Sequence, residues 1–213
     1  DNKLPKYKNY LFLFMLMSLL TLIVSFFSTF NPWGFVGILL SSIIISSSIL
    51  SLYYNYNKYG LKKFITNNNA LIAHIGVGIM ILGITCSSIF QTEFNYTFSN
   101  NEIKDDGKYS YKLTDIKMYE KNNFQELSTT FVVYRNKKII AKINPSKRYY
   151  NVSKIITTEA GIYRHWFKDF YIVLGNEKNN KWDVKIYHNP LVNFIWYGVI
   201  LMIFAGLTGI RKR

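Results

Sequence analysis

Four long apolar blocks interrupt an otherwise polar chain. They cover residues 10–30, 34–54, 70–90 and 190–210, and none of them contains Asp, Glu, Lys or Arg. Crossing the hydrocarbon core of a bilayer takes about 20 mainly apolar residues. The pattern therefore predicts four transmembrane α-helices. The first block is too long for the core of a signal peptide and no small-residue cleavage site follows it, so we expect it to remain in the mature chain.

Short runs rich in β-branched and aromatic residues fill the region between the third and fourth blocks. Several alternate apolar with polar residues, as in Trp182, Val184 and Ile186, and Asn, Lys, Gly and Asp separate them. Alternation with a period of two is typical of half-buried strands, and RNKK and NEKNNK resemble hairpin turns. We expect a small antiparallel β domain, either a sandwich or a partly open barrel. The predicted strands cover residues 109–119, 128–135, 138–143, 152–158, 169–175 and 181–188.

These elements give the chain four parts. Residues 1–69 hold two transmembrane helices and a basic inner loop, and residues 70–90 form the third helix, which carries His74. Residues 91–189 form the β domain on the outer face, and residues 190–213 form the last helix and a basic tail.

The formal net charge of +14 over 213 residues raises the question of where the basic residues lie. Three short segments outside the helices are basic and, apart from Asp1, contain no acid: 1–9, 55–69 and 211–213. Lys and Arg collect in the short loops on the cytoplasmic side of a membrane. We therefore expect both termini on the cytoplasmic or matrix side and residues 91–189 in the opposite compartment.

The charge of the outer domain does not indicate nucleic-acid binding. Residues 91–189 hold 17 basic and 11 acidic residues, and the excess of six is spread along the segment instead of forming a phosphate-binding stripe. We interpret it as a solvated basic surface, with attraction to an acidic partner or to lipid headgroups as the alternative. Cys86 is the single cysteine, so the chain has no internal disulfide and thiol chemistry is not its function.

His74 is an ionisable residue within the third apolar block. Such residues are expensive in a membrane and usually face protein, which makes them candidates for functional sites. Gly78 follows one turn later, and a glycine there would let a flat ligand such as a porphyrin approach the backbone while the imidazole holds its iron. The alternative is a neutral imidazole that hydrogen-bonds across a helix interface, because small-residue faces also serve plain helix packing. His165 and His188 lie outside the apolar blocks, and we do not expect either to be a ligand.

Several motifs, in their order and spacing, resemble the C-terminal third of the CcmF family, the membrane haem lyase subunit of System I cytochrome c maturation. The resemblance runs from about residue 68 to 213, and residues 10–54 match in hydropathy only. It rests on LIAHIGVGIMILGI, NPSKRYY, TTEAGI, DFYIVLG, KWDVKIYHNPLVNFIWYG and GLTGIRKR.

The resemblance implies a part in attaching haem covalently to the Cys-x-x-Cys-His motif of an apocytochrome c, at the outer face of an inner membrane. It also implies a haem b within the helices, for which His74 is one axial ligand. That haem is thought to take electrons from quinol and to keep the delivered haem reduced. Abundant Asn, Lys, Ile, Tyr and Phe suggest a strongly AT-biased coding genome, so we expect the mitochondrial inner membrane, with a bacterial inner membrane as the alternative.

Further positions match family motifs inside the β domain and at the start of the last helix. We expect most of them to build the β domain and dock it onto the membrane, and Glu159 and Asp169 to pair with Arg148 or Arg164. Nothing in the sequence supplies a metal cluster or a nucleophile triad, so no catalytic residue is assigned. The matching positions are Pro145, Arg148, Tyr149, Thr158, Glu159, Ala160, Asp169, Tyr171, Leu174, Gly175, Pro190, Trp196 and Gly198.

The chain departs from the family pattern in ways that predict a partner. It has no tryptophan-rich outer segment and no second transmembrane histidine. We therefore expect the C-terminal piece of a split protein, bound to a second lyase polypeptide that carries these features. A haem chaperone and apocytochrome c are further partners, and quinol is a candidate. The rival hypothesis is a non-catalytic structural subunit that scaffolds a larger inner-membrane assembly, such as a respiratory complex, without holding haem. A transporter is less favoured, because His74 is the only titratable coupling group within the apolar blocks.

Overall fold

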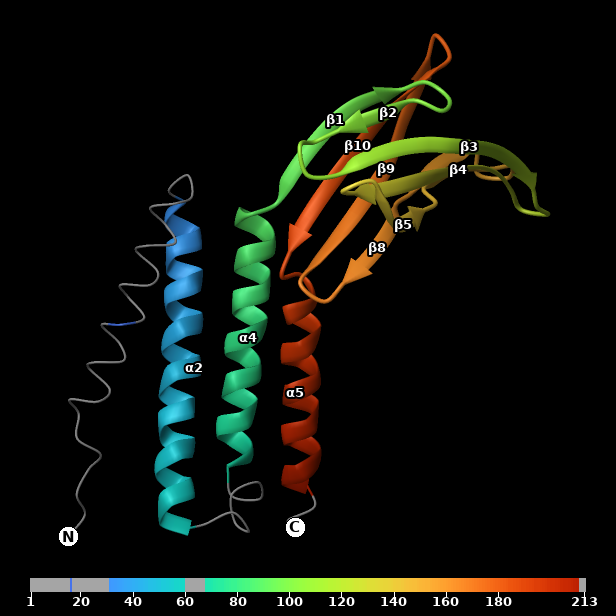
Figure 1. The fold of residues 1–213 in the computed structure, drawn as a ribbon. Helices are drawn as coiled ribbons and strands as arrows, with labels where there is room; N and C mark the ends of the chain where they lie inside the picture. The colour runs from blue at the N-terminus through green and yellow to red at the C-terminus, as the bar shows by residue number, and fades with distance from the viewer. Residues whose placement is uncertain (1–15, 17–30, 60–67, 211–213) are drawn as a thin grey trace. The chain divides into compact units, whose positions relative to one another are not determined.

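The structure is a computed structural model that describes residues 16, 31–59 and 68–210 (Figure 1). Apart from residue 16, the predicted span at 10–30 lies outside the described residues. The chain divides into two compact units. The first comprises residues 1–90 and 190–213, and the second comprises Gln91–Asn189.

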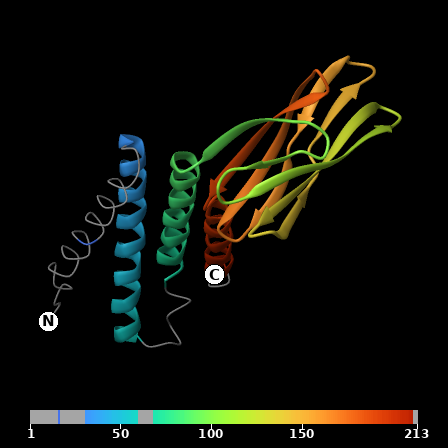
Figure 2. The same cartoon turned by 45° about the horizontal axis from the view of Figure 1, so that its top comes forward.

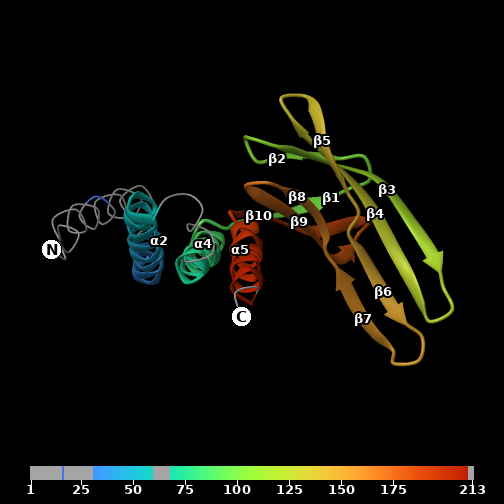
Figure 3. The same ribbon diagram turned by 90° about the horizontal axis from the view of Figure 1, so that it is seen from below.

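The helical unit contains α2 (Pro32–Tyr59), α4 (Asn69–Ile89) and α5 (Asn193–Ile210). Seen end-on, α4 lies between α2 and α5 (Figure 3). Within the described residues, three helices are long and apolar enough to cross a membrane. The last one begins three residues later than the block at 190–210 predicts, because Pro190 still belongs to a strand and Leu191 has a positive φ of 56°.

The start of α2 follows from its sequence. The side-chain Oδ1 of Asn31 accepts hydrogen bonds from the backbone N–H groups of Trp33 at 3.0 Å and Gly34 at 3.2 Å. This satisfies donors that have no partner inside the helix, and Pro32 occupies the first helical position, where its missing N–H costs nothing.

The second unit is a sandwich of two antiparallel sheets (Figure 2). One sheet has the strand order β1-β10-β9-β8, and the other has the order β2-β3-β4-β6-β7, with β5 also paired to β4. The strands are β1 (Thr92–Phe98), β2 (Ile103–Asp105), β3 (Ser110–Glu120), β4 (Phe124–Arg135), β5 (Lys138–Ile143), β6 (Ser146–Tyr150), β7 (Ile155–Glu159), β8 (Gly161–His165), β9 (Lys168–Lys178) and β10 (Lys181–Pro190).

The inward-facing residues of the two sheets form one apolar core. Alternate residues of β10, namely Trp182, Val184 and Ile186, are buried, as the period-two pattern predicts. They pack with residues of the facing sheet such as Phe131 and Val133, both fully buried. The extramembrane β structure expected from the sequence is therefore confirmed in its class, as a sandwich.

The strand pattern differs from the prediction mainly by additional strands. β1, β2, β6 and β8 were not among the predicted runs, and the run predicted at 152–158 begins only at Ile155, because Lys154 adopts a positive φ of 54° in the preceding turn. The two predicted hairpin turns are present. They connect β4 with β5 and β9 with β10, and in each turn two consecutive residues have positive φ: Asn136 and Lys137, and Asn179 and Asn180.

Candidate functional site

His74 lies in the second turn of α4, with its side chain exposed on the surface of the described helices. Its Nδ1 lies 2.5 Å from the backbone carbonyl oxygen of Ala70, one turn earlier. A carbonyl oxygen can only accept, so Nδ1 is the donor, and in the neutral imidazole Nε2 then keeps its lone pair. An imidazole oriented in this way is the form that binds a metal through Nε2.

The described residues contain no group of three or more His, Cys, Asp or Glu that would hold a metal ion. Among the described residues, His74 could therefore supply a single metal ligand, from an exposed face of α4. That is enough for an axial ligand of a porphyrin, whose own nitrogens occupy the other positions around the iron.

The glycines of α4 face its two neighbouring helices. A Cβ on Gly76 would lie 2.7 Å from the carbonyl oxygen of Gly198 in α5. Gly78 faces α2 instead: a Cβ there would lie 2.5 Å from Cγ1 of Ile45, and Ser41 Oγ donates a 2.8 Å hydrogen bond to the Gly78 carbonyl. Close helix packing accounts for both glycines, and a contact of Gly78 with a cofactor stays a prediction.

His188, at the end of β10, belongs to a buried polar cluster that the sequence did not indicate. The Tyr111 hydroxyl donates to Asp106 Oδ2 at 3.0 Å, so its oxygen accepts from His188 Nε2 at 2.6 Å. Asp106 Oδ1 accepts the backbone N–H groups of Lys108 at 2.8 Å and Tyr109 at 2.6 Å. The cluster therefore fastens the loop before β3 to the last strand of the other sheet.

Aromatic rings surround His188 and remove it from water. The ring centroids of Phe170 and Phe94 lie 4.8 and 5.2 Å from that of the imidazole, and the side chain is 12% exposed. Burial lowers the pKa of His188 to about 4; Asp106 opposes this shift, whereas Lys168 and Lys108 add to it. Burial, together with Asp106, also raises the pKa of Tyr111. Both groups are therefore neutral at pH 7, which suits a structural cluster.

The His188 cluster should make the stability of the β unit depend on pH. Because the folded pKa of about 4 lies below the ordinary value of 6.5, the unfolded chain binds a proton between these values that the folded chain does not. Stability should therefore fall as the pH drops from 6.5 to 4, by up to about 3 kcal/mol. Thermal unfolding followed by circular dichroism measures this slope. His188→Gln should flatten it and His165→Gln, at an exposed position, should not; an unchanged slope in His188→Gln would contradict the assignment.

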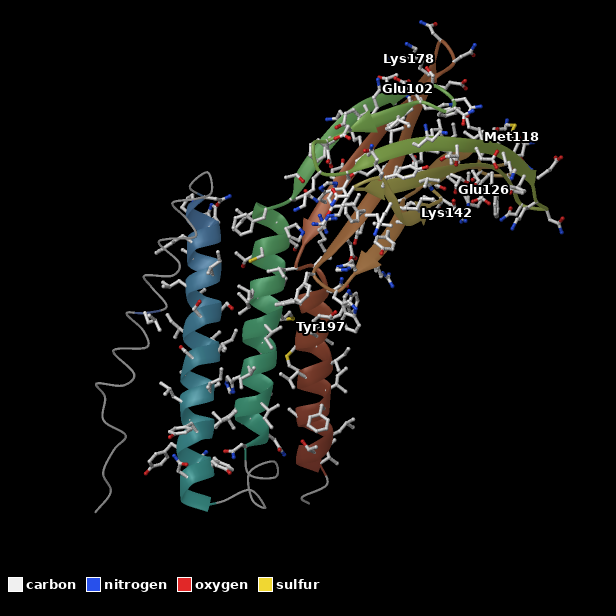
Figure 4. The ribbon with its side chains drawn as sticks, viewed as in Figure 1. Glu102, Met118, Glu126, Lys142, Lys178 and Tyr197 are labelled. Atoms are coloured by element: carbon white, nitrogen blue, oxygen red, sulfur yellow. The ribbon has the colours of Figure 1, made fainter. Side chains whose placement is uncertain are left out.

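The motif residues of β6 and β7 form an ion-pair network on the outer surface of the sandwich. Arg148 Nε lies 3.1 Å from Glu126 Oε1, and Arg148 Nη1 lies 3.7 Å from Glu159 Oε1. Ser146 Oγ also donates to Glu126 at 2.7 Å, and Figure 4 labels Glu126 on β4. The expected pairing of Glu159 with Arg148 is confirmed, and Glu126 is an additional partner that the sequence did not single out.

Asp169 has a different environment. Its side chain is buried and its Oδ1 accepts the backbone N–H of His165 at 3.3 Å, across the β8–β9 hairpin. The carboxylate therefore stabilises the hairpin locally.

A β-sandwich whose two ends continue into membrane-crossing helices, one of them with an exposed histidine, defines a membrane protein with a single extramembrane β domain. The family described as "CcmF C-terminal beta-sandwich" matches residues 89–190. The β unit belongs to this family, and the chain is similar to the C-terminal part of CcmF-type cytochrome c biogenesis proteins.

Individual relatives agree with this assignment. The cytochrome c-type biogenesis protein CcmF of Pseudomonas fluorescens is 36% identical over 143 residues, which cover 67% of this chain and 22% of that protein. CycK of Bradyrhizobium diazoefficiens is 31% identical over 145 residues, covering 68% of this chain and 22% of CycK. The chain thus spans about a fifth of the length of these relatives.

A solved structure extends the likeness to the helices. The chain described as "Cytochrome c Heme Lyase CcmF" superimposes with a TM-score of 0.77 at 14% sequence identity, over 98% of this chain and 35% of that one. At 14% identity the comparison shows a similar fold and nothing more, and the similarity covers both the helices and the β domain.

Proposed function

We propose that the chain is a subunit of a cytochrome c haem lyase that attaches haem covalently to apocytochrome c. The proposal rests on the family match of the β unit. In the chain, this unit lies between helix α4, which carries His74, and helix α5. The relatives are cytochrome c biogenesis proteins by name, and the similar structure is called a haem lyase. The chain spans about a fifth of the length of these relatives. We propose that it acts within a complex and not alone.

The residues around His74 fit a haem b. The Ala70 carbonyl fixes the imidazole, Nε2 keeps its lone pair, and the exposed helix face admits a flat macrocycle. Ala70, one turn before His74, is small and apolar. When bound, the haem would supply one-electron chemistry that keeps the delivered haem reduced. The part of this chain is to hold the iron from one side and to keep Nδ1 protonated.

We propose that the second axial ligand of this haem comes from a partner chain. The three histidines of the sequence are His74, His165 and His188, and the last two belong to the β unit. We therefore propose that a second lyase polypeptide contributes a transmembrane histidine and the tryptophan-rich segment. Haem would arrive from a haem chaperone, apocytochrome c would be the acceptor, and quinol is the proposed electron donor.

The proposed location is an inner membrane, which the apolar helices and the bacterial relatives support. We place the chain in the mitochondrial inner membrane on its composition, with a bacterial inner membrane as the alternative. Both termini would face the matrix or cytoplasm and the β unit the opposite compartment, because the basic residues outside it lie in short inner loops.

Reconstitution of cytochrome c maturation tests the proposal. The chain and its copurifying membrane partners are expressed with an apocytochrome c, and haem that remains bound after denaturing electrophoresis is stained. We expect covalent attachment to disappear when this chain alone is omitted and to return when it is supplied. Unchanged attachment, together with loss of a respiratory complex, would instead establish the rival role as a structural subunit.

A further inference from the structure

The turn between β8 and β9 exposes two large aromatic side chains. Trp166 is 71% exposed and Phe167 is 62% exposed. The core of the β unit contains other aromatic residues of the same size that are fully buried, such as Phe98 and Phe131. Adjacent exposed aromatic residues at the end of a rigid hairpin are typical of a surface that contacts another phase or partner.

This turn lies at the end of the β unit where the chain continues into its helices. Strands β9 and β10 are neighbours: Phe170 packs on His188 with 4.8 Å between ring centroids, and a Cβ on Gly175 would meet Asp183. Continuing this antiparallel register toward the turn places Asp169 beside Asn189, the last residue of the β unit. The Trp166–Phe167 turn therefore extends just past the residue at which β10 ends.

The other chain connection leaves from the same end. Gln91, which follows α4 and Phe90, donates a hydrogen bond from Nε2 to Asn189 Oδ1 at 2.5 Å. Because α4 and α5 are long and apolar enough to cross a membrane, their short connections tether this end of the sandwich to the bilayer surface. At about 3.3–3.6 Å per extended residue, two or three residues span roughly 10 Å, comparable to the depth of the headgroup region.

Basic side chains surround the same end of the sandwich. Lys168 Nζ lies 4.2 Å from the ring centroid of Tyr109, and Arg135 Cζ lies 5.9 Å from it. Two carboxylates of this region are buried, since the Asp106 side chain is 1% exposed and Asp169 is 2% exposed. We define the basic collar as Lys108, Arg135, Lys137, Lys138, Arg164 and Lys168.

Aromatic residues also mark one end of the helical unit. Trp33 at the start of α2 is 83% exposed and Trp196 near the start of α5 is 63% exposed; Tyr197, labelled in Figure 4, follows Trp196. These helix starts lie beside the end of α4, since a Cβ on Gly83 would meet the backbone of Phe194 and Ile195. Tryptophan and tyrosine gather where membrane helices cross the headgroup level.

We infer that the Trp166–Phe167 turn is a membrane-interface anchor. The two rings insert at the headgroup level of the leaflet from which α4 and α5 emerge, and the basic collar binds the phosphates of anionic phospholipids. The anchor holds the β unit to the bilayer at a third point besides its two covalent connections. It is independent of whether His74 binds haem.

Fluorescence quenching by brominated lipid tests the anchor in the full chain. The chain and its Trp166→Phe variant are reconstituted into vesicles of phosphatidylcholine and phosphatidylglycerol, with and without bromine on the acyl chains. The difference between the two proteins isolates the emission of Trp166, and we expect brominated lipid to quench it. A Trp182→Phe variant gives the matched control. The difference between this variant and the unchanged chain isolates the emission of Trp182, which brominated lipid should not quench because Trp182 is buried in the β core.

A double variant tests whether the basic collar contributes to membrane binding. Arg164→Gln with Lys168→Gln should reduce the quenching of Trp166 in vesicles with phosphatidylglycerol to the level seen in phosphatidylcholine alone. Quenching of Trp166 by aqueous acrylamide but not by brominated lipid would overturn the proposal. So would shielding of Trp166 from both quenchers in an assembled complex, because a protein partner would then cover the turn.

Discussion

Replacing His74 with Ala should abolish the low-spin b-type spectrum of the assembled complex. The side chain supplies the iron-binding nitrogen, and the described helices contain no other histidine. Removing a residue that hydrogen-bonds to a metal ligand typically lowers the affinity for the metal 10–100-fold. Removing the ligand itself should therefore lower the haem content at least as much. Absorbance of the dithionite-reduced complex, purified with its partner chains, measures the effect.

Two further variants separate ligation from misfolding. His74→Gly should regain the low-spin spectrum when imidazole is added, because free imidazole occupies the space of the missing side chain. Ser88→Ala removes an exposed hydroxyl of the same helix, which donates only to the Ile84 carbonyl at 2.8 Å, and should retain haem. A full b-type spectrum in His74→Ala would exclude this histidine as the ligand.

The helices and most strands could be predicted from the sequence because their signals are local. Blocks without charge determine where a chain can cross a bilayer, and α4 at Asn69–Ile89 lies within one residue of the block predicted at 70–90. Strand β1 carries the same kind of signal, with Phe94, Tyr96 and Phe98 on alternate positions, but the polar residues Asn95 and Thr97 between them weaken its apolar appearance. β6 was missed because SKRYY has no apolar alternation, and its pairing with β4 and β7 defines it instead.

The candidate site was only partly predictable. His74 stands out because a titratable residue interrupts an apolar block, a signal that one position carries by itself. The Asp106–Tyr111–His188 cluster depends on a contact across 77 residues, so nothing in the local sequence indicates it. The glycines of α4 illustrate a third case: their spacing suggested room for a ligand, and only the neighbouring helices show that Gly76 faces Gly198 and Gly78 faces Ile45.

The contact between Gly76 and Gly198 leads to the second large effect. A Cβ on Gly198 would overlap the Gly76 carbonyl oxygen and would lie 2.7 Å from the backbone nitrogen of Met80. Backbone atoms cannot move away by changing rotamer, so Gly198→Val forces α4 and α5 apart and removes the packing that holds them together.

Gly198→Val should therefore lower the thermal midpoint of the helical unit. Overpacking costs about 1–3 kcal/mol, and for a chain of this size roughly 2–4 °C is lost per kcal/mol, so the expected drop is roughly 2–12 °C. Helical circular dichroism during heating in detergent measures it. Gly206→Val is the matched control in the same helix, because a Cβ there meets no atom within 4 Å. Equal midpoints for the two variants would show that the close approach of α4 and α5 does not contribute to stability. Gly76 lies two residues from His74 and thus on the opposite side of α4, so a lower midpoint with haem retained would also separate helix packing from ligation.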